Sequence, residues 1–290
     1  MSFSRYILLH TFDLVGKWLA RTGKRDDIFL ATKFAFLHIG DQPGPIYNTS
    51  PKYVKIACEK SLKRLGVRCI DLYYCHRVDG VTPIEETVKA MVELKNEGMI
   101  KYIGLSEISS ETLRCACKVH HIDAVQIEYS LWSLDIEHPD INLFKTCREL
   151  GVATVAYSLL GHGILTGAYK SVDDLNASDV RRYMPRFSPE NFPKNLELVN
   201  ALSAFAETKG CTSSQLTLAW LLAQGDDIFP IPGTKKIEYL EENLGALKVD
   251  LTKEDVQQIR SLVERAGAQG GRYPDHAKDS LFADTPELKK

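Results

Sequence analysis

Short apolar runs alternate with amphipathic segments along the whole 290-residue chain. The runs are mostly apolar at consecutive positions, which is typical of strands that are covered on both faces in a parallel sheet. This pattern predicts six strands, at residues 28–34, 71–77, 102–107, 124–130, 153–159 and 228–233. Alternation of strands with helices favours either a doubly wound sheet or a (β/α)8 barrel.

The segments between these runs carry signals for helix ends. A Ser-Pro pair at residues 50–51 precedes a helix that should end at Gly66, because Pro is favoured at the first helical position and Gly just past the last. Thr82 and Glu85 have the spacing of a capping box, and the helix that follows should stop at Gly98. Further helices are predicted at residues 140–150, 194–209, 213–224, 235–246 and 252–265.

Composition narrows the class of protein. Lys and Arg number 36 against 38 Asp and Glu, a net charge of −2, which argues against nucleic acid or an anionic membrane as the main partner. No apolar run approaches the length of a membrane span. Seven scattered cysteines are typical of a reducing compartment and not of a disulfide framework. We therefore expect a cytoplasmic α/β enzyme, and the sequence points to no partner protein.

Polar residues follow each predicted strand. In a barrel the chemistry lies at the carboxyl ends of the strands, so a ring of polar residues there predicts a functional site. A cluster at Cys115, Cys117, His120 and His121 is set aside as a metal site, because the two cysteines would face different sides of a helix. No metal is expected. The strand-end residues are Lys33, His76, Ser106, Glu107, Gln126, Glu128, Tyr157, Ser158 and the segment 232–236.

These segments resemble the aldo-keto reductase family. Residues 28–33 resemble its catalytic-lysine strand and residues 71–76 its catalytic-histidine strand. Residues 156–167 resemble its stacking tyrosine and pyrophosphate loop, and residues 231–245 resemble its adenosine-phosphate site. The resemblance runs in family order from about Leu14 to the C-terminus. We therefore predict a barrel domain over residues 14–290, preceded by an atypical segment at residues 1–13.

The resemblance implies a TIM-type (β/α)8 barrel that uses NADPH to reduce a small aldehyde or ketone. Lys33 and His76 would be the catalytic residues, and Tyr157 would stack on the nicotinamide. Two lysines at a helix N-terminus would suit the 2′-phosphate of NADPH. The implied cofactor-binding residues are Ser106, Glu107, Gln126, Tyr157, Ser158, Leu160, Gly161, Gly163, Gly233, Thr234, Lys235, Lys236, Glu242 and Asn243.

One family motif is missing upstream of Lys33. The family's proton-donating tyrosine and its aspartate lie in an Asp-x-x-x-x-Tyr motif, and Tyr6 and Asp13 have the wrong order and spacing for it. Six strand signals stand where the barrel has eight, and residues 4–10 are the only further strand-like run. We therefore expect a barrel that is incomplete at its N-terminus and a reductase of low activity. The alternatives are a non-catalytic NADPH-binding or regulatory protein and a poorly folded fragment.

Overall fold

The computed structural model describes residues 3–37 and 46–289. The chain divides into two compact units, each built from discontinuous segments. The first unit contains Met1–Val125, Leu150–Val152 and Ser280–Lys290, and the second contains Gln126–Glu149 and Ala153–Asp279.

The first unit is built on parallel strands. Its strands are β1 (Ala31–Phe34), β4 (Ile70–Cys75) and β5 (Ile100–Ser106). β4 pairs with both of the others, with Lys33 opposite Tyr74 and Tyr74 opposite Gly104. All six residues of β4 are buried, as expected for a central strand with both faces covered. The close approach at Gly104 requires glycine, because a Cβ there would lie 2.3 Å from the Tyr74 ring.

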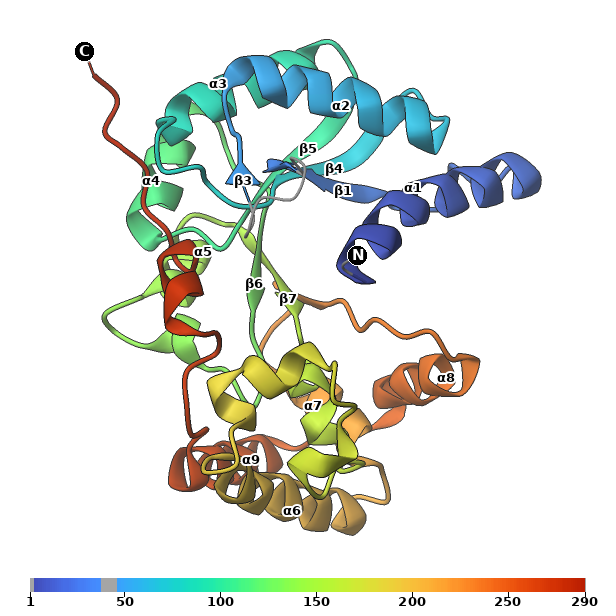
Figure 1. Cartoon of the computed structure of the whole chain (residues 1–290), viewed down its shortest axis with the longest axis vertical. Coiled ribbons are helices and arrows are strands. Elements are labelled where there is room, and N and C mark those ends of the chain that lie inside the picture. The colour runs from blue at the N-terminus through green and yellow to red at the C-terminus, as the bar shows by residue number, and fades with distance from the viewer. Residues whose placement is uncertain (1–2, 38–45, 290) are drawn as a thin grey trace. The chain divides into compact units, whose positions relative to one another are not determined.

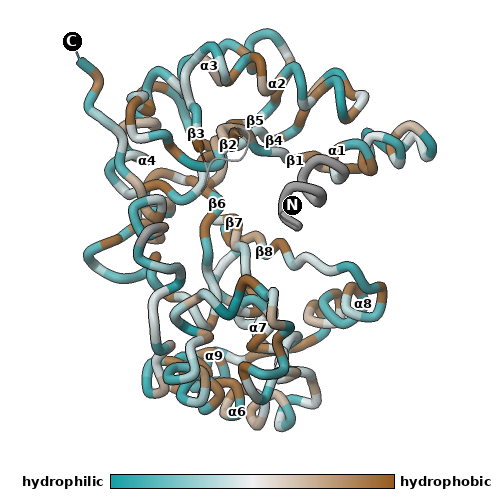
Figure 2. Tube along the Cα trace, in the orientation of Figure 1, coloured by the Kyte–Doolittle hydropathy of each residue, from teal (hydrophilic) through white to brown (hydrophobic). Residues whose placement is uncertain are grey.

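Helices cover this part of the sheet in chain order. α2 (Pro51–Leu65) packs against α3 (Ile84–Asn96), and α3 packs against α4 (Ser110–Val119) (Figure 1). Hydrophobic and hydrophilic residues alternate along α2 and α3 (Figure 2), as expected for helices that bury one face. Two short strands, β2 (Phe36–Leu37) and β3 (Ile46–Tyr47), pair antiparallel.

The chain begins its described part with a helix. α1 (Phe3–Thr22) contains residues 4–10, so the strand-like run there is helical and covers no sheet edge as a strand. α1 packs on α2, where Arg64 forms a 3.1 Å ion pair with Asp13 and a Cβ on Gly16 would lie 2.7 Å from the Arg64 carbonyl oxygen. This helix crosses the domain boundary expected near residue 14, and that boundary stays a prediction.

The second unit contains the remaining strands and most of the later helices. β7 (Ala153–Tyr157) pairs parallel with β8 (Ile228–Pro230), and the last three residues of β6 (Ala124–Glu128) belong to this unit. Its helices are α5 (Leu143–Glu149), α6 (Phe192–Thr208), α7 (Ser213–Leu222), α8 (Ile237–Gly245) and α9 (Lys253–Ala266). α6 packs against α7 and α9, while α7 also packs against β8 and buries Trp220 completely.

The predicted strands and helices are present, with ends that shift by a few residues. Gly66 ends α2 in the left-handed conformation (φ 66°), and its N–H donates to the Leu62 carbonyl as predicted. The capping box at Thr82 is wrong: α3 has Pro83 as its N-cap, and the Thr82 hydroxyl donates to Asp79 at 2.9 Å. α4 was not predicted. None of the helices in the described ranges is long and apolar enough to cross a membrane.

Candidate active site

Lys33 and His76 lie at the carboxyl ends of neighbouring strands of the first unit. Phe34 is opposite Cys75 in the register of β1 and β4, and the His76 N–H donates to the Phe34 carbonyl at 3.0 Å. The His76 ring lies 6.4 Å from the ring of Phe36, measured between centroids. The structure thus brings together the two residues that the sequence proposes as catalytic, and their catalytic roles stay a prediction.

The surroundings of both side chains disfavour positive charge. Burial, and then the nearby Arg77 guanidinium, lower the pKa of Lys33 to about 8. Burial, followed by the charges of Lys33 and Arg77, lowers the pKa of His76 to about 3. The imidazole is therefore neutral at pH 7, in the form that can hydrogen-bond a carbonyl oxygen without itself adding charge.

These pKa values predict how stability depends on pH. Between pH 6.5 and 3 the unfolded state binds a proton at His76 that the folded state excludes, so the free energy of unfolding should fall as pH falls through this window. Between pH 8 and 10.5 the folded state has lost the Lys33 proton that the unfolded state keeps, so this free energy should rise with pH. Urea unfolding across pH, compared with His76→Gln and Lys33→Met, measures each contribution. A His76→Gln curve parallel to that of the wild type between pH 3 and 6.5 would contradict the first part.

Ser106 ends β5 and Glu107 follows it, and both are buried. Glu107 adopts a positive φ of 53° and its carboxylate lies 3.8 Å from the Arg77 guanidinium. The Glu107 carboxylate therefore lies next to the Arg77 guanidinium, the cation that also lowers the pKa of Lys33 and of His76. Whether Ser106 and Glu107 contact a cofactor, as the resemblance implies, stays a prediction.

The second unit contains the predicted nicotinamide and pyrophosphate residues. Gln126 is buried within β6, and Tyr157 is the last residue of β7. The turn from Ser158 (φ 53°) to Gly163 (φ 96°) has several positive φ values. Its second half overlaps the start of a 3-10 segment, Gly161–Thr166. Such turns form concave backbone surfaces that suit anions.

Gly161 in this turn has a packing role. Its φ is 56°, and a Cβ there would lie 2.1 Å from the Trp132 ring. Gly163 is less crowded, since a Cβ would lie 3.3 Å from Arg181 and from Tyr169. Leu160 lies within this turn, and its carbonyl accepts the Gly163 N–H at 2.9 Å. The glycines therefore give the loop its shape, which is the physical reason for the sequence pattern there.

The predicted adenosine-phosphate residues lie directly before α8 and in its second half. Lys236 is the N-cap residue of this nine-residue helix, and its amine lies 3.1 Å from the Glu238 carboxylate and 4.7 Å from the centre of the Tyr239 ring. Lys235 and Lys236 are both exposed. Positive charge and a helix N-terminus both favour a phosphate group.

The neighbouring residues complete this end of the predicted site. Thr234 accepts the Lys236 N–H at 3.1 Å, and a Cβ on Gly233 would meet no atom within 4 Å. Glu242 accepts a 2.7 Å hydrogen bond from the Thr212 hydroxyl, and Asn243 is buried. The residues present therefore fit the phosphorylated adenosine half of a dinucleotide. No group of His, Cys, Asp and Glu in the described ranges is placed to hold a metal ion.

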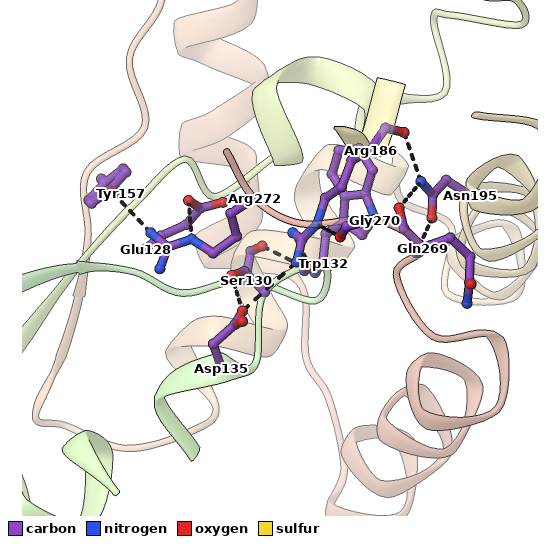
Figure 3. A network of polar contacts seen from close by, with 11 residues as sticks. Glu128, Ser130, Trp132, Asp135, Tyr157, Arg186, Asn195, Gln269, Gly270 and Arg272 are labelled. Carbon is purple, nitrogen blue, oxygen red and sulfur yellow. Dashed lines mark hydrogen bonds and ion pairs between the residues drawn. The ribbon is translucent and has the colours of Figure 1, made fainter. Parts of the chain in front are cut away.

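Sequence reasoning missed a buried polar network in the second unit (Figure 3). The Arg186 guanidinium donates to the carbonyls of Trp132 at 2.6 Å and Gly270 at 3.1 Å. Arg272 pairs with Glu128 at 2.8 Å and donates to the Tyr157 hydroxyl at 3.1 Å. Glu128 was noted as a strand-end residue, but nothing in the sequence signals partners 144 positions apart.

Strand-end lysine and histidine residues in the first unit, and a glycine turn and a lysine pair in the second, are together typical of one class of α/β oxidoreductase. The comparisons with known proteins agree, since the model of the Aldo/keto reductase family matches residues 11–264. The chain belongs to this family. The result confirms the resemblance seen in the sequence.

Curated relatives match nearly the whole chain. "Aldo-keto reductase yakc [NADP(+)]" of Schizosaccharomyces pombe is 50% identical over 278 residues, which is 96% of this chain and 82% of the relative. "Aldo-keto reductase str7" of Strobilurus tenacellus is 54% identical over 276 residues, which is 95% of this chain and 80% of the relative. The loss of N-terminal barrel strands is not borne out by these matches and stays a prediction.

Solved structures share the fold. The glycerol dehydrogenase AKR11B4 from Gluconobacter oxydans superposes with a TM-score of 0.79 at 25% identity, covering 90% of this chain and 79% of that one. The thermostable aldo-keto reductase Tm1743 gives a TM-score of 0.68 at 28% identity, covering 87% of this chain and 77% of that one. The predicted α/β fold class of the TIM-barrel type is therefore confirmed.

Proposed function

We propose that the protein is an NADPH-linked oxidoreductase that reduces a small aldehyde or ketone to the alcohol. The observation that carries this proposal is the placement of a half-buried lysine of lowered pKa and a neutral histidine at the carboxyl ends of adjacent strands. The family assignment and the name of the yeast relative, which includes NADP(+), support the choice of cofactor. The compartment expected from the cysteines is the cytoplasm.

Each group has a role in this chemistry. NADPH, when bound, supplies the hydride that forms the new C–H bond at the carbonyl carbon. The electron pair of the C=O π bond then moves to oxygen, and a proton must reach that oxygen. Neutral His76 would hydrogen-bond the carbonyl oxygen, and the Lys33 ammonium would stabilise the negative charge that develops there. Lys235 and Lys236 would bind the 2′-phosphate, and Tyr157 would stack on the nicotinamide.

A second candidate is a non-catalytic NADPH-binding protein. The observation behind it is the exposed lysine pair Lys235 and Lys236 at the start of α8, which would bind the nucleotide with or without turnover. Both candidates require NADPH binding, and they differ in whether a carbonyl is reduced.

Thermal unfolding with and without NADPH tests the cofactor assignment. A ligand that binds only the folded state at about 100 times its Kd adds about 2.7 kcal/mol, which should raise Tm by roughly 5–10 °C in a protein of this size. NADH is the matched control, because it lacks the 2′-phosphate that the two lysines are proposed to bind. Lys235→Ala together with Lys236→Ala should reduce the shift with NADPH and leave that with NADH unchanged. A Tm that neither nucleotide moves would refute the proposal.

A further inference from the structure

A buried ion pair joins the segment after α9 to the end of β6. The Arg272 guanidinium lies 2.8 Å from the Glu128 carboxylate, and each side chain is only 3% exposed. Burial alone would lower the pKa of Arg272, but the charge of the Glu128 carboxylate leaves this pKa raised. The guanidinium therefore stays charged, and Glu128 balances its charge within the unit.

The Arg272 guanidinium also contacts Tyr157, the residue that is predicted to stack on the nicotinamide. Arg272 donates from a second nitrogen to the Tyr157 hydroxyl at 3.1 Å (Figure 3). A planar guanidinium presents its donors in a fixed fork, so pairing with Glu128 also fixes the direction of the donor that meets Tyr157. Glu128 and Tyr157 end β6 and β7, so both ends of this contact are set by strands.

The segment that carries Arg272 is itself held in place. The Asn195 side chain accepts the Gln269 N–H at 2.8 Å and donates to the Gln269 carbonyl at 3.0 Å. Arg186 donates to the next carbonyl, that of Gly270, at 3.1 Å. These contacts hold the backbone two and three residues before Arg272. The segment that carries the guanidinium is therefore fixed in place by hydrogen bonds.

Beyond Arg272 the segment meets the glycine turn. The Tyr273 ring lies 6.4 Å from the His162 ring in an edge-on arrangement, measured between centroids. The Arg181 guanidinium donates to the His162 carbonyl at 2.8 Å. The residues after α9 thus contact both predicted nicotinamide-side features of the second unit, the ring of Tyr157 and the turn that follows it.

We propose that Arg272 is a positioning residue, which holds the Tyr157 ring in the orientation that stacks on the nicotinamide and thereby sets the affinity for NADPH. The inference rests on the proposed function, since it requires NADPH to bind. An aromatic ring that is already held at its hydroxyl loses less conformational entropy when it stacks on the nicotinamide. The affinity for NADPH is therefore higher than with an unrestrained ring. Arg272 would act through Tyr157, and the pairing with Glu128 would keep its fork aligned.

The test measures the Kd of NADPH by its fluorescence in the full chain and its variants. Tyr157→Phe keeps the ring and removes only the hydroxyl, while Arg272→Lys keeps the charge opposite Glu128 and loses the fork. Each should weaken NADPH binding by about tenfold, the worth of a hydrogen bond to a charged group. Because both remove the same contact, the double variant should also be about tenfold weaker and not about 100-fold.

A matched arginine serves as the control. Arg148 pairs with Asp227 at the same distance of 2.8 Å within the same unit, but its side chain is 43% exposed. Arg148→Lys should therefore leave the Kd unchanged. Melting temperatures of all variants separate a general loss of stability from an effect on binding.

Three outcomes overturn the inference. One is an unchanged Kd in Arg272→Lys with a lowered Tm, which would make Arg272 an anchor of the C-terminal segment only. Another is single-variant effects that multiply in the double variant. If Arg272→Lys does not fold, an unchanged Kd in Tyr157→Phe decides against the inference. A wild-type chain that does not bind NADPH would instead overturn the proposed function, and this inference with it.

Discussion

Glu128→Ala is expected to reduce the free energy of unfolding by about 3–5 kcal/mol. The variant leaves the Arg272 guanidinium buried without the carboxylate that lies 2.8 Å from it. An uncompensated buried charge costs far more than the loss of a neutral contact, because no water replaces the missing partner. Urea or guanidinium unfolding measures the change.

The exposed pair of Arg148 and Asp227 provides the control for this prediction. It has the same 2.8 Å separation, but both side chains are more than one third exposed. Asp227→Ala should cost only about 0–1 kcal/mol, since water screens the remaining charge. Glu128→Ala combined with Arg272→Met should cost less than Glu128→Ala alone, because it removes both charges. Equal effects of Glu128→Ala and Asp227→Ala would contradict the argument.

The sequence predicts the repeating strands and helices well because their signals are local. A buried strand such as β4 requires consecutive apolar residues, and a helix end such as Gly66 requires a left-handed backbone. The strand-like run at residues 4–10 is misleading for a related reason. A short apolar run does not distinguish a strand from a turn or two of a helix, and the backbone there belongs to α1.

The capping box at Thr82 fails because of a competing local contact. Asp79 accepts the N–H groups of Val81 and Thr82 and also the Thr82 hydroxyl, so this side chain is used in a turn before the helix begins. α4 could have been found. Ser109 accepts the Thr112 N–H, an N-cap signal that is visible in the sequence.

The candidate site likewise has a part that the sequence predicts and a part that it does not. Lys33 and His76 could be placed from the sequence, because residues that end neighbouring parallel strands lie at one edge of a sheet. The network of Arg186 and Arg272 could not, because its partners are 54 and 144 positions away and only the folded chain brings them together. The burial that lowers the pKa of Lys33 is likewise a property of the fold.

Lys33→Met is expected to lower the turnover of aldehydes with NADPH by about 10²–10³-fold, the usual effect of removing one group that stabilises charge developing on an oxygen. Lys33 lies on β1, next to the strand that His76 follows, and its ammonium is proposed to stabilise the charge on the carbonyl oxygen. NADPH oxidation with a panel of aldehydes, measured side by side for the wild type and the variant, tests this expectation.

NADPH affinity separates a chemical role of Lys33 from a role in binding. The Kd of NADPH should survive in Lys33→Met, because the lysines proposed to bind its phosphate lie at the start of α8 and not on β1. A non-catalytic NADPH-binding protein would show no turnover for the variant to remove. Turnover within tenfold of the wild type in Lys33→Met would contradict the role proposed for this lysine.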